Sequence, residues 1–317
     1  MRLEEVKSLC DKIKGNISKV IVGNDDTIDM ILTTLLCSGH ILLEDVPGVG
    51  KTTLAKCLAK SISSDFKRIQ FTPDLLPSDL TGVNYYNQKT GDFVFRAGPI
   101  FANIILADEI NRATPRTQSS LLECMEEKQV TIDGVTHLLS RPFLVIATQN
   151  PIEIHGTFPL PEAQMDRFFM RLRMGHPNTE ESRRILDRFQ SVSSAPEIDS
   201  VADSSEIIEA QEVCLSVKIV DDVKDYIVTI TENTRKHEKV SLGVSPRGSI
   251  ALMKAAQAYA VLQNRDYVLP DDVKKTAVPV LAHRLVLKGH AVAGGTDAQE
   301  NIINEILKET PVPLEIF

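Results

Sequence analysis

The sequence predicts an α/β domain, in which a five-stranded parallel sheet lies between helices, followed by a domain made of helices. Three observations predict this fold. Short apolar runs alternate with helical periodicity in the first part of the chain, which is typical of a parallel sheet covered on both faces. The 317 residues exceed what one hydrophobic core usually holds. After Gly175-His176-Pro177 the pattern is helical, so we place the two domains at residues 1–176 and 177–317.

Two helices precede the predicted sheet. Apolar residues spaced by three and four across residues 3–20 predict an amphipathic helix. Ile21-Val22-Gly23 interrupts that spacing, and residues 28–38 then predict a second helix that is buried on most sides.

Five short apolar runs predict the strands, and ligands of such a sheet gather at the carboxyl ends of its strands. Helices are predicted at residues 117–127 and 161–168. Two segments predict β-hairpins, residues 84–95 and residues 129–139, the second around Asp133-Gly134. The predicted strands are residues 41–43, 67–71, 104–107, 143–147 and 170–174.

The second domain is predicted to contain helices joined by loops. Ser245-Pro246 provides an N-cap residue followed by proline at the first helical position, so a helix begins there. Residues 193–205, which are rich in Ser, Ala, Pro and Asp, predict a loop. The predicted helices are residues 180–190, 221–236, 245–263, 271–282 and 296–309.

Composition excludes several classes of protein. The net charge is −8 and no run of five Lys or Arg occurs, which argues against a dedicated nucleic-acid binder but leaves open a local basic pore. The five cysteines form no C-x-x-C pair, so they predict buried, reduced thiols of a cytoplasmic protein. The N-terminus has no apolar signal segment and no apolar run is long enough to cross a bilayer, so we expect no membrane insertion.

A glycine-rich turn between a strand and a helix predicts a phosphate-binding loop. Its backbone N–H groups and the helix N-terminus attract anions. Lys51 is expected to reach the β- and γ-phosphates of ATP, and the Thr52 hydroxyl to ligate Mg²⁺. Asp45 stands where the pattern G-x-x-x-x-G-K-[ST] has its first glycine, so its carboxylate should turn away from the phosphates. The loop residues predicted to bind nucleotide are Asp45, Val46, Pro47, Gly48, Val49, Gly50, Lys51, Thr52 and Thr53.

Polar side chains end the next two buried strands. Asp108 fits a Mg²⁺ ligand, and Glu109 fits the general base that polarises the attacking water. Asn150 could orient that water or contact the γ-phosphate, or it could simply form a turn before Pro151.

Two arginines are candidates for stabilising charge during phosphoryl transfer. Arg167 follows a short predicted helix near the last strand. Arg247 lies in the first turn of a predicted helix, where a cation opposes the helix dipole, which suggests that it meets an anion. The alternative for each is a solvated charge or an ordinary salt bridge.

The sequence resembles the MoxR family of AAA+ ATPases over nearly its whole length. The resemblance depends on several specific motifs. They are Leu43-Glu44-Asp45-Val46-Pro47-Gly48-Val49-Gly50-Lys51-Thr52, Leu106-Ala107-Asp108-Glu109-Ile110-Asn111-Arg112-Ala113, Thr117-Gln118-Ser119-Ser120-Leu121-Leu122-Glu123 with Met125-Glu126-Glu127, Ala147-Thr148-Gln149-Asn150-Pro151, Pro159-Leu160-Pro161-Glu162-Ala163-Gln164, Gly243-Val244-Ser245-Pro246-Arg247 and Tyr267-Val268-Leu269-Pro270-Asp271-Asp272-Val273.

This resemblance implies roles for individual residues. Asn150 corresponds to sensor 1, Arg167 to the arginine finger that acts on a neighbour's nucleotide, and Arg247 to sensor 2. Val22 and Gly23 match the segment that lies against the adenine. The two predicted hairpins are similar to the helix-2 insert and the pre-sensor-1 insert of the family, and the helical domain to its lid. Family members form hexameric rings, act as chaperone-like remodellers and usually partner proteins with von Willebrand factor A domains.

Three functions compete at this stage. The first is an ATP-driven remodelling ATPase that works as an oligomeric ring. The second is a nucleotide-switched scaffold with little turnover, against which Glu109, Asn150 and Arg167 argue. The third is a DNA-acting motor or a magnesium-chelatase-like subunit, for which the acidic tip Asp133-Gly134 is weak contrary evidence in the case of DNA.

Overall fold

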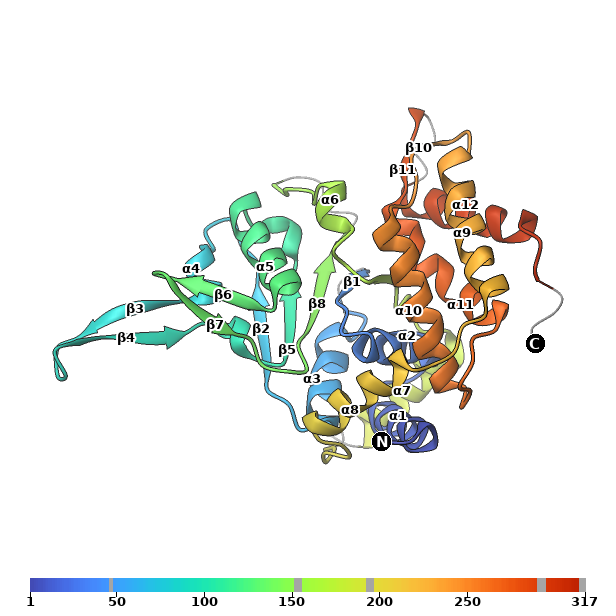
Figure 1. Cartoon of the computed structure of the whole chain (residues 1–317). Coiled ribbons are helices and arrows are strands. Elements are labelled where there is room, and N and C mark those ends of the chain that lie inside the picture. The colour runs from blue at the N-terminus through green and yellow to red at the C-terminus, as the bar shows by residue number, and fades with distance from the viewer. Residues whose placement is uncertain (46–47, 151–155, 192–196, 290–294, 314–317) are drawn as a thin grey trace.

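The computed structural model describes residues 1–45, 48–150, 156–191, 197–289 and 295–313. It confirms the predicted α/β core, with a five-stranded sheet in the order β2-β5-β8-β1-β9, and all of its strand pairs are parallel (Figure 1). The strands are β1 (Ile41–Glu44), β2 (Phe66–Gln70), β5 (Ile104–Asp108), β8 (Leu144–Gln149) and β9 (Met170–Leu172).

Alternate residues of the central strands enter two apolar clusters, one on each face of the sheet, because successive side chains of a strand point to opposite faces. Leu106 and Ile146 join a cluster with α1 (Leu3–Ser18), α2 (Asp25–Leu36) and α3 (Lys51–Ser61). On the other face, the central strands and α5 (Pro115–Glu127) contribute to a second cluster, which contains Ile105, Ala107, Val145, Leu121 and Leu122. Burial on both faces explains why these strands are continuous apolar runs in the sequence.

Two hairpins extend from the core, and both were predicted. The first pairs β3 (Gly82–Asn87) with β4 (Asp92–Ala97) after the short α4 (Pro77–Thr81), and projects well beyond the sheet (Figure 1). The second pairs β6 (Gln129–Ile132) with β7 (Val135–Leu138).

The second hairpin, from its turn at Asp133 to His137, contacts the part of the first hairpin that is close to the core. Asn84 Nδ2 donates to Asp133 Oδ2 at 2.7 Å, and the Phe95 ring stacks on His137 with centroids 4.3 Å apart. The hairpins therefore form one connected projection.

The remainder of the chain is mainly helical and packs against α1 and α2. Gln211 Nε2 donates to the Leu35 carbonyl at 2.8 Å, and apolar side chains of both parts belong to the same cluster. The boundary at residues 176/177 stays a prediction. The helices are α7 (Thr179–Ser191), α8 (Ser204–Leu215), α9 (Asp221–Lys236), α10 (Pro246–Leu262), α11 (Pro270–Leu281) and α12 (Gly295–Glu309).

Three elements differ from the predictions. Helix α8, with a capping box formed by Asp203 and Glu206, begins within the predicted loop. The helical region also contains a small antiparallel pair, β10 (Val240–Leu242) and β11 (Val286–Leu287), so it is not purely helical. Helix α6 covers only Glu162–Met165, because the chain turns toward β9 and the Phe169 N–H donates to the His40 carbonyl at 2.8 Å.

Among the residues that the structure describes, no helix is both long and apolar enough to cross a membrane.

Short 3₁₀ turns occur at Pro99–Phe101 (η1), Ile110–Arg112 (η2) and Ala282–Arg284 (η3). Because the sheet is parallel, the carboxyl ends of β1, β5 and β8 open at one edge, where the site described next is located.

Candidate active site

The loop after β1 ends at a helix N-terminus that is suited to bind an anion. Gly48 and Gly50 have φ angles of +90° and +93°, in the left-handed region that favours glycine. Helix α3 begins at Lys51 and has no acidic residue in its first turn. Its first N–H groups have no partner within the helix, so they are available to phosphate oxygens.

The Asp45 carboxylate turns away from this loop, as expected. It is 7% exposed and accepts hydrogen bonds from the backbone N–H groups of Met174 and, at 3.1 Å, Gly175. Asp45 therefore ties the start of the loop to the end of β9. The predicted residues Val46 and Pro47 lie outside the described part of the chain, while the Lys51 ammonium donates to the Asp45 carbonyl at 2.9 Å.

The acidic pair meets the end of β8 through one threonine. The Thr148 hydroxyl donates to Asp108 Oδ1 at 2.6 Å and accepts the Glu109 N–H at 2.8 Å. Glu109 has a φ of +57°, a strained value for a non-glycine residue that is often seen at functional sites. Thr148 thus fixes the relative positions of the two carboxylates.

Three further side chains hold the two carboxylates from outside. Arg68 of β2 pairs with Asp108 Oδ2 at 2.6 Å. Gln70 Nε2 donates to Glu109 Oε2 at 2.8 Å, and Arg112 Nε lies 3.1 Å from the same oxygen. These residues and Thr148 were not predicted from the sequence as parts of the site. For Arg68 and Gln70 the available signal was two polar side chains at the carboxyl end of a strand.

These groups surround one cavity of about 380 Å³. The cavity collects residues from the loop, the start of α3 and the ends of three strands, so Lys51, Thr52, Asp108, Glu109 and Asn150 are brought together as predicted. Its lining consists of Gly48, Gly50, Lys51, Thr52, Thr53, Arg68, Asp108, Glu109, Thr148 and Asn150.

The donor set fits a magnesium nucleotide. Mg²⁺ prefers oxygen ligands and usually takes only one or two from the protein, with phosphate and water supplying the rest. The Thr52 hydroxyl and the Asp108 carboxylate line the same cavity and are of this kind. Within the described ranges no group of three or more His, Cys, Asp or Glu could hold a metal on its own.

The structure brings Arg167 and Arg247 together at a place other than this cavity, whose described lining contains neither. Arg167 Nε lies 3.1 Å from Glu126 Oε2, and Arg247 Nη2 donates to Glu126 Oε1. Ser245 caps α10 by accepting the Gly248 N–H at 3.3 Å, as its sequence predicted. The two arginines come from the core and from the helical region, respectively.

Val22 and Gly23 lie between α1 and α2. Val22 is 8% exposed and Gly23 has a φ of +73°. A Cβ atom on Gly23 would lie 2.2 Å from a carboxylate oxygen of Glu181, so the first turn of α7 covers this segment. Contact of Val22 and Gly23 with adenine stays a prediction.

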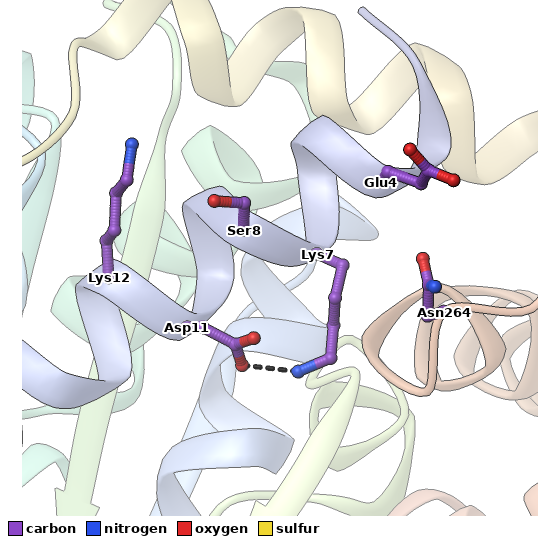
Figure 2. A pocket seen from close by; sticks show the side chains of 6 residues that line it. All are labelled: Glu4, Lys7, Ser8, Asp11, Lys12 and Asn264. Atoms are coloured by element: carbon purple, nitrogen blue, oxygen red, sulfur yellow. Dashed lines mark hydrogen bonds and ion pairs between the residues drawn. The ribbon is translucent and has the colours of Figure 1, made fainter.

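A larger depression of about 600 Å³ lies along α1 and has different chemistry. Figure 2 shows side chains of one helix face around it, with Lys7 paired to Asp11 and Asn264 approaching from a neighbouring turn. Its described lining includes neither a glycine-rich loop nor the end of a strand, so the candidate active site is the cavity at the sheet edge.

Comparison with known proteins agrees with this geometry. Residues 40–170 match the model of the "ATPase family associated with various cellular activities (AAA)", and residues 232–306 match an "AAA lid domain". "Uncharacterized protein YeaC" of Bacillus subtilis is 52% identical, over 98% of this chain and 97% of that protein. "Chaperone MoxR1" of Mycobacterium tuberculosis is 41% identical over 94% and 80%.

A solved structure has the same fold. The crystal structure of a proposed ATPase from Cytophaga hutchinsonii superimposes with a TM-score of 0.91 at 39% identity. The alignment covers 98% of this chain and 97% of that one.

Proposed function

We propose a function from one premise: the chain belongs to the MoxR family of AAA+ ATPases. The proposed function is Mg²⁺-dependent hydrolysis of ATP by an oligomeric ring that remodels client proteins. The observation that supports it most is the single cavity shared by the loop at Gly48–Lys51, the carboxylates of Asp108 and Glu109, and Asn150.

Different residues of this cavity would bind the phosphates, hold Mg²⁺ and activate the attacking water. The backbone of Gly48 and Gly50 and the ammonium of Lys51 would bind the phosphates, and Thr52 with Asp108 would hold Mg²⁺, which supplies charge neutralisation. Glu109 would accept the proton of the attacking water, with the Asn150 amide orienting that water.

Glu109 is held by Gln70 and Arg112. Both contacts are made with Oε2, so they fix the orientation of the carboxylate within the subunit, and Arg167, the arginine expected to complete the site, comes from a neighbour. We therefore expect slow turnover by isolated subunits, which is consistent with a site that assembly completes.

The position of Arg167 supports assembly before turnover. Arg167 does not line the cavity of its own subunit. This is the position expected of an arginine that contacts the phosphates bound by a neighbour. A hexameric ring, and a partner with a von Willebrand factor A domain, are the assembly and partner we propose on the basis of family membership.

The projecting hairpin offers a surface for a client. Tyr86 and Phe93 pack edge to face at its tip with centroids 5.6 Å apart, and Phe93 is 73% exposed. Large exposed apolar side chains on a projection are typical of protein contact sites. Hydrolysis that moves the helical region relative to the core would move such a client.

The test is ATP turnover per subunit over a wide range of protein concentration. We expect turnover to rise with concentration and to be lost in Arg167→Ala, because the arginine completes a neighbour's site. Constant turnover down to the lowest concentration would show that each chain hydrolyses alone.

The scaffold alternative is separated by Glu109→Gln. The remodelling mechanism expects normal ATP binding with turnover reduced at least about a hundredfold, because the general base is lost. A scaffold with little turnover would keep its effect on the client in this variant, so loss of that effect despite normal ATP binding would rule the scaffold out.

A further inference from the structure

Glu126, near the C-terminus of α5, contacts two arginines that are far apart in the sequence. One oxygen, Oε2, lies 3.1 Å from Arg167 Nε, and the other, Oε1, accepts from Arg247 Nη2. The Glu126 side chain is 34% exposed and Arg247 is 49% exposed, so the cluster is at the surface. One carboxylate therefore bridges a core arginine and an arginine of the helical region.

A second, more buried link joins the same two segments. Asp166 Oδ1 accepts from Arg284 Nε at 2.7 Å, and Asp166 Oδ2 accepts from the Ser245 hydroxyl at 3.2 Å. Asp166 immediately precedes Arg167, and Ser245 is two residues before Arg247. Arg284 is 3% exposed and also donates to the Phe168 carbonyl at 2.8 Å.

This buried link sets where the two arginine backbones lie, but not where their side chains point. Arginine has several rotatable bonds, and two guanidinium groups brought close together repel each other. A carboxylate between them neutralises one of the two charges and restricts both side chains. The trio keeps a net positive charge, which suits it to a further anion.

We propose that Glu126 is a positioning residue that holds Arg167 and Arg247 as one paired cation for the phosphates bound by a neighbouring copy of this chain. The inference rests on the proposed function. Glu126 does not contact the nucleotide itself. One arginine belongs to the core and the other to the helical region. Stabilisation of the neighbour's phosphates would therefore depend on the positions of both parts.

The experiment compares Glu126→Gln with Glu123→Gln, an exposed glutamate one turn earlier on the same helix. We expect Glu126→Gln to lower kcat about tenfold at saturating protein concentration while the KM for ATP changes less than twofold, since the loop of the same subunit is intact. Glu123→Gln should behave as wild type. Equal thermal midpoints of the two variants exclude a folding defect as the cause.

A double-mutant cycle tests whether Glu126 acts through Arg247. In an Arg247→Ala background, Glu126→Gln should lower kcat less than twofold further, because the arginine pair that Glu126 holds together no longer exists. Fully additive losses would overturn the inference, since they would mean that Glu126 acts independently. A rise in kcat in Glu126→Gln would also overturn it, because Glu126 would then compete with the neighbour's phosphates.

Assembly supplies a readout that does not depend on hydrolysis. We expect the protein concentration for half-assembly, measured by sedimentation with a non-hydrolysable ATP analogue, to rise about fivefold in Glu126→Gln. If wild type assembles but does not turn over, this shift supports Glu126 while hydrolysis fails as the function. If wild type turns over and Glu126→Gln matches it in both measurements, the inference alone fails. A wild type that neither assembles nor turns over overturns both.

Discussion

Replacing Asp45 by glycine restores the glycine that the phosphate-loop pattern calls for, yet the structure predicts a less stable protein. The carboxylate accepts the buried Met174 N–H and the partly buried Gly175 N–H. A hydrogen bond to a charged group contributes about 1.5–3 kcal/mol. Counting the second bond at half value because of its exposure, we expect loss of the two hydrogen bonds in Asp45→Gly to lower the free energy of unfolding by about 2–4.5 kcal/mol.

Urea unfolding of the dilute, nucleotide-free protein measures this change as a shift in midpoint at constant slope. Asp45→Ala separates the lost hydrogen bonds from the extra backbone freedom of glycine, which adds about 0.5–1 kcal/mol. Asp45→Asn keeps one acceptor oxygen and should lose about half as much. Unchanged stability in Asp45→Gly, or tighter ATP binding, would refute the argument that Asp45 serves as a tie and not as a defective loop residue.

Three other predictions concern Mg²⁺ binding beside Arg68, the protonation of His40 and the reactivity of three buried thiols. Arg68→Ala should lower the Mg²⁺ concentration needed for half-maximal turnover about two- to fivefold, because Arg68 occupies Asp108 Oδ2; an increase in that concentration would contradict this. Burial lowers the pKa of His40 from 6.5 to about 4, and its Nδ1 accepts the Val145 N–H at 3.0 Å, so it must stay neutral in the fold. Between these two pH values the unfolded chain binds more protons than the folded chain, so stability should fall as the pH falls. From about pH 6.5 to about pH 4, His40 should lower the free energy of unfolding by about 3 kcal/mol. The urea midpoint plotted against pH should therefore have a shallower slope in His40→Gln than in wild type. Burial raises the pKa of Cys10, Cys124 and Cys214 to about 12, so iodoacetamide should label these thiols only when the protein unfolds, and rapid labelling of the native protein at pH 8 would contradict their burial.

The sheet could be predicted because its strands are buried on both faces. Ile104–Asp108 is apolar up to its last residue, where the chain reaches the ligand-binding edge. The two-residue strand Val286–Leu287 is too short to show any period. Helix Ser204–Leu215 was missed because its apolar residues do not follow one stripe, and Leu215 is 66% exposed.

The candidate site also contains residues that the sequence predicts and residues that only the fold reveals. Lys51, Asp108 and Glu109 carry a local signature, since each stands at the end of a strand or the start of a helix. Arg68 has only the weak signal of a polar residue near the carboxyl end of a strand, and the sequence indicates no role for Glu126. Their importance comes from contacts across 40 residues with Asp108 and across 121 residues with Arg247, which only the folded chain creates.

The end of β9 is the point where nucleotide binding and the helical region meet. Met174 and Gly175 hold the Asp45 carboxylate, and so hold the start of the phosphate loop. A few residues later α7 begins, and its Glu181 lies directly over Gly23. Displacement of the loop by a bound phosphate would therefore act on Asp45 at the same place where the chain leaves the sheet. This short path requires no long chain of side-chain contacts, because the loop, the strand end and the first turn of α7 are already linked by Asp45 and by the backbone.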